Sequence, residues 1–420
     1  MSEPLAARAE PQVFVARQPV VDPRERVYGY ELLFRDSLDN VYPKTDGARA
    51  SARVIADSSL VFGIRQLTGG RRAFINFTRE TLLAGYAQLL PRELVVVEVL
   101  ESVGPEADVV EACGELRRLG YTLALDDFPG QDWDSPLLAL AHMVKIDVRV
   151  TASASLAAIA KTAVKRGLIP LAEKVETREE YDAAVAHGYQ YFQGYFLSHP
   201  VILSGRQIST VKLQLLRLLA QVHAPTLNIA RVAEVIERDV ALSYKLMRFI
   251  NSAFFSFKTR ITSVRHGLTL IGDAAIRKWV SLLALAEIAA DRPTELLLSS
   301  LARARACELI VERAGRGGEA TDAFLVGLFS LLDALLGVPM AEALRELPIS
   351  ADSRAALLGG GPLRPVLEGT TACERGAWTA LEGVARALGV PDAAMAGAHV
   401  EALAWAEETL GHTGGQDEAR

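Results

Sequence analysis

The chain has 420 residues, of which 50% are hydrophobic and 23% charged, a composition typical of a well-buried globular protein with one to three domains. Its net charge of −6 argues against a main role in coating nucleic acid. Three scattered cysteines, Cys113, Cys307 and Cys373, predict reduced thiols without a disulfide framework or zinc cluster. The opening MSEPLAARAEPQ lacks the apolar core of a signal peptide, and no apolar segment is long enough for a membrane span, so we expect a cytoplasmic protein.

The first half alternates short strand-like apolar runs with helical segments. The runs are VFVARQPVV, VYGYELLF, RAFINF, LVVVEVL, YTLALDD, HMVKIDV, LIPLAEKV and YQYFQGY. Helical segments between them, such as ARASARVIADSSLVFGI and EADVVEACGELRRLG, predict a parallel sheet covered by helices. The number of runs predicts a small (β/α)8-type barrel. An open doubly wound sheet is the competing fold, but no GxGxxG phosphate loop follows the first run.

The pattern changes near LSHPVILSGRQIST, residues 197–210. Beyond it Leu, Ala and Arg recur at helical spacing, as in VKLQLLRLLAQV and LARARACELIVERAG, and Gly and Pro separate the segments. This pattern predicts an all-helical domain of at least seven helices. We therefore expect a flexible N-terminus over 1–11, a barrel over 12–200, a helical domain over 201–405 and a frayed tail over 406–420.

Each strand-like run of the first half carries a polar side chain at or near its C-terminal end. These residues are Glu31, Asn76, Glu98, Asp126 with Asp127, Lys145, Glu173 with Glu176, and Gln193. In a parallel barrel the C-terminal strand ends meet at one mouth, so these side chains are expected to converge. Such oxygen ligands suit Mg²⁺ or Mn²⁺, and paired ions can activate water for attack on phosphorus. Any single acid in this position is more often solvated or caps a helix, but the series favours a metal and phosphate site.

The motifs from Gln12 to Pro200 resemble the EAL domain, the fold of cyclic-di-GMP phosphodiesterases. RQPVVDPRERVYGYELLFR resembles the opening of that family, with ELLFR in place of its EAL-x-R signature. FINF, VEVLES, LALDDF, VKID, AEKVET and FQGY follow in the family's order. The motifs are specific together because they occur in order, and they imply a (β/α)8-type barrel.

The resemblance also implies a role for each residue that matches a family motif. The implied metal ligands, for Mg²⁺ or Mn²⁺, are Glu31, Asn76, Glu98, Asp126 and Asp127. The implied catalytic groups are Lys145, which would support the attacking water, and Glu173. The implied nucleotide contacts are Gln18, Leu33, Arg35 and Gln193, with Arg35 on a phosphate.

Three positions depart from the family pattern, and all lie in motifs that carry the implied metal ligands or catalytic groups. Leu32 replaces the alanine of the EAL signature, Pro129 replaces the glycine after the aspartate pair, and Lys174 replaces the glycine of AEGVE. Proline fixes φ and removes an amide donor, so the loop after Asp127 cannot copy the active conformation. Lys174 places a cation among the acids. Because catalysis is sensitive to displacements of about 1 Å, these changes predict weakened turnover.

The second half, from Leu203 to Ala404, resembles the HDOD domain, a relative of HD phosphohydrolases that lacks their metal motif. The similarity is carried by LLRLLAQVHAPTLNIARVAEVIERDVALSYKLMRFINSAFFSFKTRITSVRHGLTLIG and FLVGLFSLLDALLGVP. An HD hydrolase needs a His-Asp pair, and none of the histidines of this half (His223, His266, His399 and His412) precedes an aspartate. The helical half is therefore expected to be non-catalytic. An EAL domain followed by an HDOD domain is a recognised signalling architecture, in which ELLFR and AEKVE are common.

Three functions follow from these resemblances. The favoured one is a cyclic-di-GMP signalling protein whose barrel binds the dinucleotide with a divalent metal and hydrolyses it little or not at all, while the HDOD domain relays the signal to a protein partner. The first alternative is an active Mg²⁺- or Mn²⁺-dependent phosphodiesterase that yields linear pGpG. The second is a ligand-free scaffold for protein contacts. The sequence leaves open whether the barrel forms a homodimer.

Overall fold

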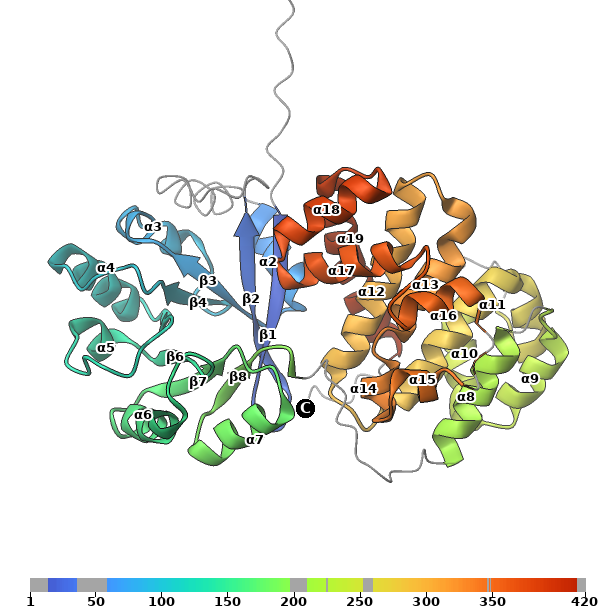
Figure 1. The fold of residues 1–420 in the computed structure, drawn as a ribbon, viewed down its shortest axis with the longest axis horizontal. Coiled ribbons are helices and arrows are strands. Elements are labelled where there is room, and N and C mark those ends of the chain that lie inside the picture. Colours follow the sequence, from blue (N-terminus) through green and yellow to red (C-terminus); the bar gives the residue numbers. More distant parts are fainter. Residues whose placement is uncertain are drawn as a thin grey trace, which may run out of the picture.

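The computed structural model describes residues 14–35, 59–196, 210–223, 226–251, 260–345, 347 and 349–413, which form a barrel and a helical domain lying side by side (Figure 1). The expected N-terminal segment 1–11 and the expected joint at 200/201 lie outside the described residues. Cys113, Cys307 and Cys373 are buried free thiols, as expected. In the part of the chain that the structure describes, no helix has both the length and the apolar character needed to cross a bilayer.

The barrel contains eight strands in sequence order and closes between the first and the last. The strands are β1 (Phe14–Val21), β2 (Val27–Arg35), β3 (Arg72–Phe77), β4 (Val95–Val99), β5 (Thr122–Leu125), β6 (Met143–Asp147), β7 (Ile169–Glu173) and β8 (Tyr191–Gln193). The helices around it are α2 (Ser59–Thr68), α3 (Arg79–Leu83), the 3-10 turn η1 (Tyr86–Leu89), α4 (Ala107–Arg118), α5 (Pro136–Leu140), α6 (Ser153–Lys165) and α7 (Arg178–His187). The (β/α)8-type prediction is confirmed.

The expectation of a wholly parallel sheet was wrong for the first strand. β1 runs antiparallel to both β2 and β8, whereas the pairs from β2–β3 to β7–β8 are parallel. The turn between β1 and β2 explains this difference, because it is closed by Asp22, whose amide bonds the Arg26 carbonyl at 2.9 Å. A connection this short permits only an antiparallel pair, since a parallel pair needs a crossover of a dozen or more residues.

The barrel interior contains an apolar layer beneath a polar one. The apolar layer consists of Val20, Phe74, Val96, Ala124, Met143 and Leu171. Side chains two residues apart on a strand point to the same face. The next inward positions on β3, β4, β6 and β7 are therefore Asn76, Glu98, Lys145 and Glu173. Because side chains alternate between the two faces of each strand, these polar side chains lie at the C-terminal mouth, directly above the apolar layer.

The helical domain follows as a bundle with a kinked long helix. Its elements are α8 (Thr210–Val222), α9 (Ile229–Glu237), α10 (Val240–Ile250), α11 (Val264–Ile288), α12 (Thr294–Arg313), the turn η3 (Gly317–Glu319), α13 (Ala320–Phe329), α14 (Leu332–Leu336), α15 (Met340–Ala343), α16 (Ala351–Leu357), α17 (Arg364–Arg375), α18 (Trp378–Leu388) and α19 (Asp392–Thr413). The kink in α11 falls at Gly272, whose φ is +77°. The all-helical prediction is confirmed.

The last helix extends further than the sequence analysis placed it. A frayed tail was expected from residue 406, but α19 continues to Thr413. Ala406 is fully buried, and Glu407 forms an ion pair with Arg17 of β1 at 3.1 Å. Contact with the barrel therefore stabilises the end of this helix.

The two halves are in direct contact where β1 and α2 of the barrel lie beside α17 and α19 (Figure 1). The Tyr30 hydroxyl donates to Oε2 of Glu295 at 2.7 Å, and both side chains are buried. The guanidinium of Arg17 lies 4.3 Å from the centre of the Tyr30 ring. Buried, satisfied polar contacts of this kind fix one relative arrangement of the two packed surfaces.

Candidate functional site

Lys145 is at the centre of the site, deep in the barrel mouth. Its side chain is 2% exposed, and its Nζ lies 3.2 Å from Glu31, 2.9 Å from Asp126 and 3.3 Å from Glu173. Nζ also donates a short hydrogen bond to Glu98. These four acids come from β2, β4, β7 and the residue after β5, so the barrel brings together groups that are far apart in sequence. Burial lowers the pKa of Lys145, but the four carboxylates raise it more, and its pKa is well above the ordinary value.

Glu31 is held by two amide side chains as well as by Lys145. Nδ2 of Asn76 donates to Glu31 Oε1 at 3.0 Å, and Nε2 of Gln193 donates to Glu31 Oε2 at 2.6 Å. Burial raises the pKa of Glu31, but Lys145 and these hydrogen bonds outweigh it, so the pKa is below its usual range. Glu98 differs, because burial and the nearby Glu31 raise its pKa well above the usual range.

The acids around Lys145, together with Asn76, form a first group. A second group of acids lies beside it and consists of Asp127, Asp147 and Glu173. Their carboxylate oxygens lie within 4.8 Å of one another, close enough to share one cation. The cation found there is the ammonium of Lys174, at 2.7 Å from Asp147 and 3.1 Å from Asp127. Burial raises the pKa of Glu173 to about 8, despite the proximity of Lys145. Glu176, also named from the sequence, forms an ion pair with Arg149 instead.

The first group has a donor set that fits a divalent metal ion. Asn76 Oδ1 and Glu98 Oε2 are buried and have no hydrogen-bond partner. Buried oxygens without partners are costly, and a hard cation such as Mg²⁺ or Mn²⁺ would satisfy them. The oxygen-only set of Glu31, Asn76, Glu98 and Asp126 suits these ions. Four of the five residues that the sequence named as ligands thus lie together, and the fifth, Asp127, lies in the second group.

The loop after Asp127 has a conformation of its own. Asp127 has φ +42°, and Gly130 has φ +73°. A Cβ on Gly130 would lie 2.2 Å from Cδ1 of Ile159 in α6, so this turn requires glycine. The indole of Trp133 donates to the Gly130 carbonyl at 3.0 Å and packs on Phe128 with ring centres 4.9 Å apart. The loop is thus anchored by its own contacts and by α6.

The four residues named for nucleotide contact have different surroundings. Gln193 Nε2 donates to Gln18 Oε1 at 3.0 Å, so Gln18 belongs to the same hydrogen-bond network as Glu31. Leu33 is half-buried, with Cδ1 3.6 Å from the position a Cβ on Gly376 would take. Arg35 is the last residue of β2, and its side chain lies outside the described part of the structure.

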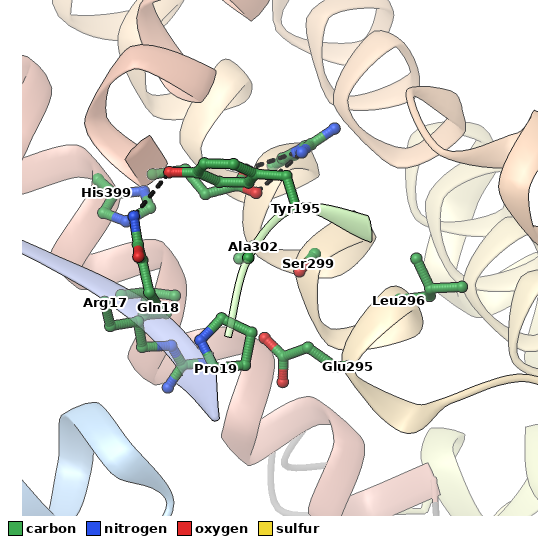
Figure 2. A pocket seen from close by; sticks show the side chains of 13 residues that line it. Arg17, Gln18, Pro19, Tyr195, Glu295, Leu296, Ser299, Ala302 and His399 are labelled. Carbon is green, nitrogen blue, oxygen red and sulfur yellow. Dashed lines mark hydrogen bonds and ion pairs between the residues drawn. The ribbon is translucent and has the colours of Figure 1, made fainter. Parts of the chain in front are cut away.

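A small cavity opens beside Gln18, between the barrel and the helical domain (Figure 2). It measures about 40 Å³, enough for at least one water molecule. Its polar lining includes Glu295, Arg303, Glu374 and His399 from the helices. Gln18 Nε2 donates to the Tyr195 hydroxyl across this cavity at 2.8 Å, and the Arg375 guanidinium lies 4.9 Å from the Tyr195 ring centre. The network of the mouth thus reaches the end of α17.

Sequence reasoning missed three residues of this site. Asp147 lies two residues after Lys145 on β6, so the period of a strand could have placed it in the mouth. Tyr195 follows Gln193 by the same spacing. Arg375 reaches the site only through the docking of the two halves, for which no local signal exists.

Comparison with known families matches two segments of the chain. Residues 45–200 match the EAL domain and residues 208–347 match the HDOD domain. The uncharacterized protein YuxH of Bacillus subtilis is 39% identical, over 83% of this chain and 87% of that protein. Cyclic di-GMP phosphodiesterase CdgJ of Vibrio cholerae is 35% identical, over 94% of this chain and 92% of that protein.

Solved structures with EAL domains are more distant. The EAL enzyme Bd1971, bound to cAMP and cyclic-di-GMP, is 20% identical over 45% of this chain and 62% of its own, with a TM-score of 0.38. BlrP1 of Klebsiella pneumoniae, in a calcium and cyclic-di-GMP complex, is 22% identical over 46% of this chain and 57% of its own, with a TM-score of 0.37. The matched domains and the two full-length relatives show that the chain belongs to the family in which an EAL domain is followed by an HDOD domain.

Proposed function

We propose that the barrel mouth binds cyclic-di-GMP together with a divalent metal ion, turns it over slowly, and passes the bound state to the HDOD domain. The observation that carries this proposal is the convergence of Glu31, Glu98 and Asp126 on the buried ammonium of Lys145, with Asn76 bonded to Glu31. The family supplies the ligand class, since the relative CdgJ is named a cyclic di-GMP phosphodiesterase.

Electrostatics makes the proposed binding metal-dependent. Seven acids lie at the mouth, against the two ammonium groups of Lys145 and Lys174; the acids are Glu31, Glu98, Glu101, Asp126, Asp127, Asp147 and Glu173. An anionic dinucleotide placed on this surface alone would meet like charges, which disfavours binding. Glu31, Asn76, Glu98 and Asp126 would hold a divalent ion, whose charge would offset that repulsion and which would supply Lewis-acid polarisation of a phosphate and a water molecule.

The chain's own groups would orient the reacting atoms. Lys145 is fixed by its four carboxylate neighbours, so its ammonium can hold an attacking water or the charge that develops on phosphorus. Gln193 and Asn76 hold Glu31 from both sides and so fix its rotamer. Slow turnover is expected because the second acid group already holds Lys174, whereas an in-line displacement is best served by paired metal ions.

A full phosphodiesterase is the alternative, and one observation favours it. The groups named for chemistry, Lys145 and Glu173, are both present and lie 3.3 Å apart through Nζ and Oε2. In this alternative Lys174 would assist rather than weaken the reaction, and the product would be linear pGpG.

The link to the helical half is the hydrogen-bond path from Glu31 through Gln193 and Gln18 to Tyr195, whose ring lies under Arg375 of α17. A ligand that reorients Gln18 would change the contact of Tyr195 with α17. This supports a role for the HDOD domain in relaying occupancy to a protein partner, and it also offers a residue pair with which to test that role.

The test is calorimetric titration of cyclic-di-GMP into the full chain, with Ca²⁺ or with EDTA, followed by detection of linear product with Mn²⁺. We expect binding with Ca²⁺, none with EDTA, and turnover too slow to detect on the timescale of seconds. Asp126→Asn should abolish binding, whereas the exposed Glu111→Gln on α4 should not. Rapid multiple turnover would establish the phosphodiesterase alternative. Absence of binding with every ion would leave the scaffold function.

A further inference from the structure

We propose that the ammonium of Lys174 is a built-in cation that takes the place of one metal ion, so that the barrel mouth binds a single divalent ion rather than a pair. This inference rests on the proposed function in one respect, namely that the acids around Glu31 and Asn76 bind a metal. It goes beyond that function by assigning Lys174 a role and the site a metal stoichiometry.

The second acid group has the geometry of a cation site. Asp127, Asp147 and Glu173 present carboxylate oxygens within 4.8 Å of one another, as a cation site requires. The Lys174 Nζ lies 2.7 Å from Asp147, 3.1 Å from Asp127 and 3.6 Å from Glu173. The ammonium therefore already occupies the position from which a metal ion would contact all three acids.

Asp147 has little capacity left to bind a metal ion. Its Oδ1 accepts the backbone amides of Arg149 at 2.8 Å and of Val150 at 3.3 Å. Its Oδ2 is the oxygen paired with Lys174. A metal entering this group would have to displace the ammonium from a carboxylate that is 6% exposed.

The backbone is strained at Lys174 and Asp127. Among the described residues other than glycine, only Glu25, Asp127, Asp132 and Lys174 have positive φ. Two of these four, Lys174 at +57° and Asp127 at +42°, pair with each other across the mouth. A left-handed conformation favours glycine or asparagine and is costly for lysine. Strain of this kind persists where the surrounding structure demands it and marks functional sites, and here it aims a lysine at the acid group.

A fixed ammonium has different chemistry from a metal ion. It carries one positive charge instead of two, and it supplies no open coordination position for a water molecule. Asp147 and Asp127 take two of the three N–H bonds of Lys174, and Glu173 at 3.6 Å lies beyond hydrogen-bond distance. The Lys174 side chain is 50% exposed, so the third N–H bond is available to a phosphate oxygen. The mouth can therefore bind a phosphate through one metal and one ammonium, while the paired-metal route to hydroxide is closed.

The test counts Mn²⁺ ions per chain. Isothermal titration with Mn²⁺ is carried out on the wild type, Lys174→Gly and Lys174→Arg, and electron paramagnetic resonance records whether the bound ions are isolated or paired. We expect one isolated Mn²⁺ in the wild type and in Lys174→Arg, which keeps the positive charge. We expect two in Lys174→Gly, with the exchange-broadened signal of ions about 4 Å apart. If the glycine variant fails to fold, Lys174→Asn serves instead, because asparagine tolerates positive φ.

The outcomes separate this inference from the proposed function. Two Mn²⁺ ions in the wild type, or only one in both Lys174→Gly and Lys174→Asn, would overturn the role of Lys174 and leave the proposed function standing. No Mn²⁺ in the wild type or in any variant would overturn the metal site of the proposed function, and this inference with it. One ion in the wild type and two in Lys174→Gly would establish the substitution.

Discussion

Replacing Lys145 by methionine tests the electrostatic account of the barrel mouth without any assay of activity. The substitution keeps much of the length of the side chain and removes its charge. Lys145 Nζ lies within 3.3 Å of carboxylate oxygens from four residues, and the most exposed of those side chains is 15% exposed. Without the ammonium, these acids face one another across a space from which water is largely excluded.

The magnitude follows from the burial of the group. Removing one partner of a buried ion pair typically costs about 3–5 kcal/mol, because an uncompensated charge remains. Glu98 and Glu173 have raised pKa values and can take up protons, which prevents a larger loss. For a domain of this size each kcal/mol lowers Tm by about 2–4 °C, so the barrel of Lys145→Met should melt roughly 6–20 °C below the wild type.

The assay is thermal unfolding of the full chain in EDTA at pH 8, followed by circular dichroism. Lys161→Met on α6 is the matched control, since Lys161 is exposed and its loss should change stability by no more than about 0.5 kcal/mol. A Lys145→Met protein that melts within 2 °C of the wild type would show that Lys145 does not neutralise the buried acids.

Three further changes test other parts of the structure. Gly194→Ala should destabilise the barrel by about 3 kcal/mol or more in urea unfolding, because Gly194 has φ +149° and an added Cβ would lie 1.9 Å from the carbonyl oxygen of Val175; an unchanged midpoint would contradict this. Burial raises the pKa of Glu295 to about 7, so the folded chain retains a proton that the unfolded chain releases above about pH 4.5. Stability therefore falls as pH rises from about 4.5 to about 7. Glu295→Gln should make Tm less dependent on pH in thermal melts from pH 5 to 8. Burial lowers the pKa of His399 to about 4, so the unfolded chain gains a proton first as pH falls below about 6.5. His399→Gln should therefore lessen the loss of stability at low pH, and an unchanged loss between about pH 6.5 and about 4 would refute this.

Much of the barrel and of its mouth could be predicted from the sequence, because both depend on local patterns. Strands with period-two alternation place Asn76, Glu98 and Glu173 inside by the same rule that buries the apolar residues two positions earlier. The direction of β1 was also readable, since the turn that begins at Asp22 is too short for a crossover.

What the sequence could not indicate depends on docking between distant segments. Arg17 meets Glu407, and Arg375 meets Tyr195, at separations that no periodicity records. The end of α19 was misplaced for this reason, because its last turns are supported by the barrel and not by their own pattern. The place of the Lys174 ammonium was likewise hidden, since a motif shows that a lysine replaces a glycine but not which acids it reaches.

β1 has a consequence for how this protein can be divided. Neighbouring residues of the strand make different contacts. Gln18 belongs to the hydrogen-bond network of the mouth, and Arg17 forms an ion pair with α19. The strand thus belongs both to the barrel mouth and to the interface with the helical domain, so neither domain can be exchanged independently of the other. A barrel excised near residue 200 would expose the buried side chains of Arg17 and Tyr30. It would also lose Arg375, which lies over the ring of Tyr195. A recombinant protein with a different helical domain would have to keep the surface that faces β1. The barrel and the helical domain therefore have to be inherited or engineered together.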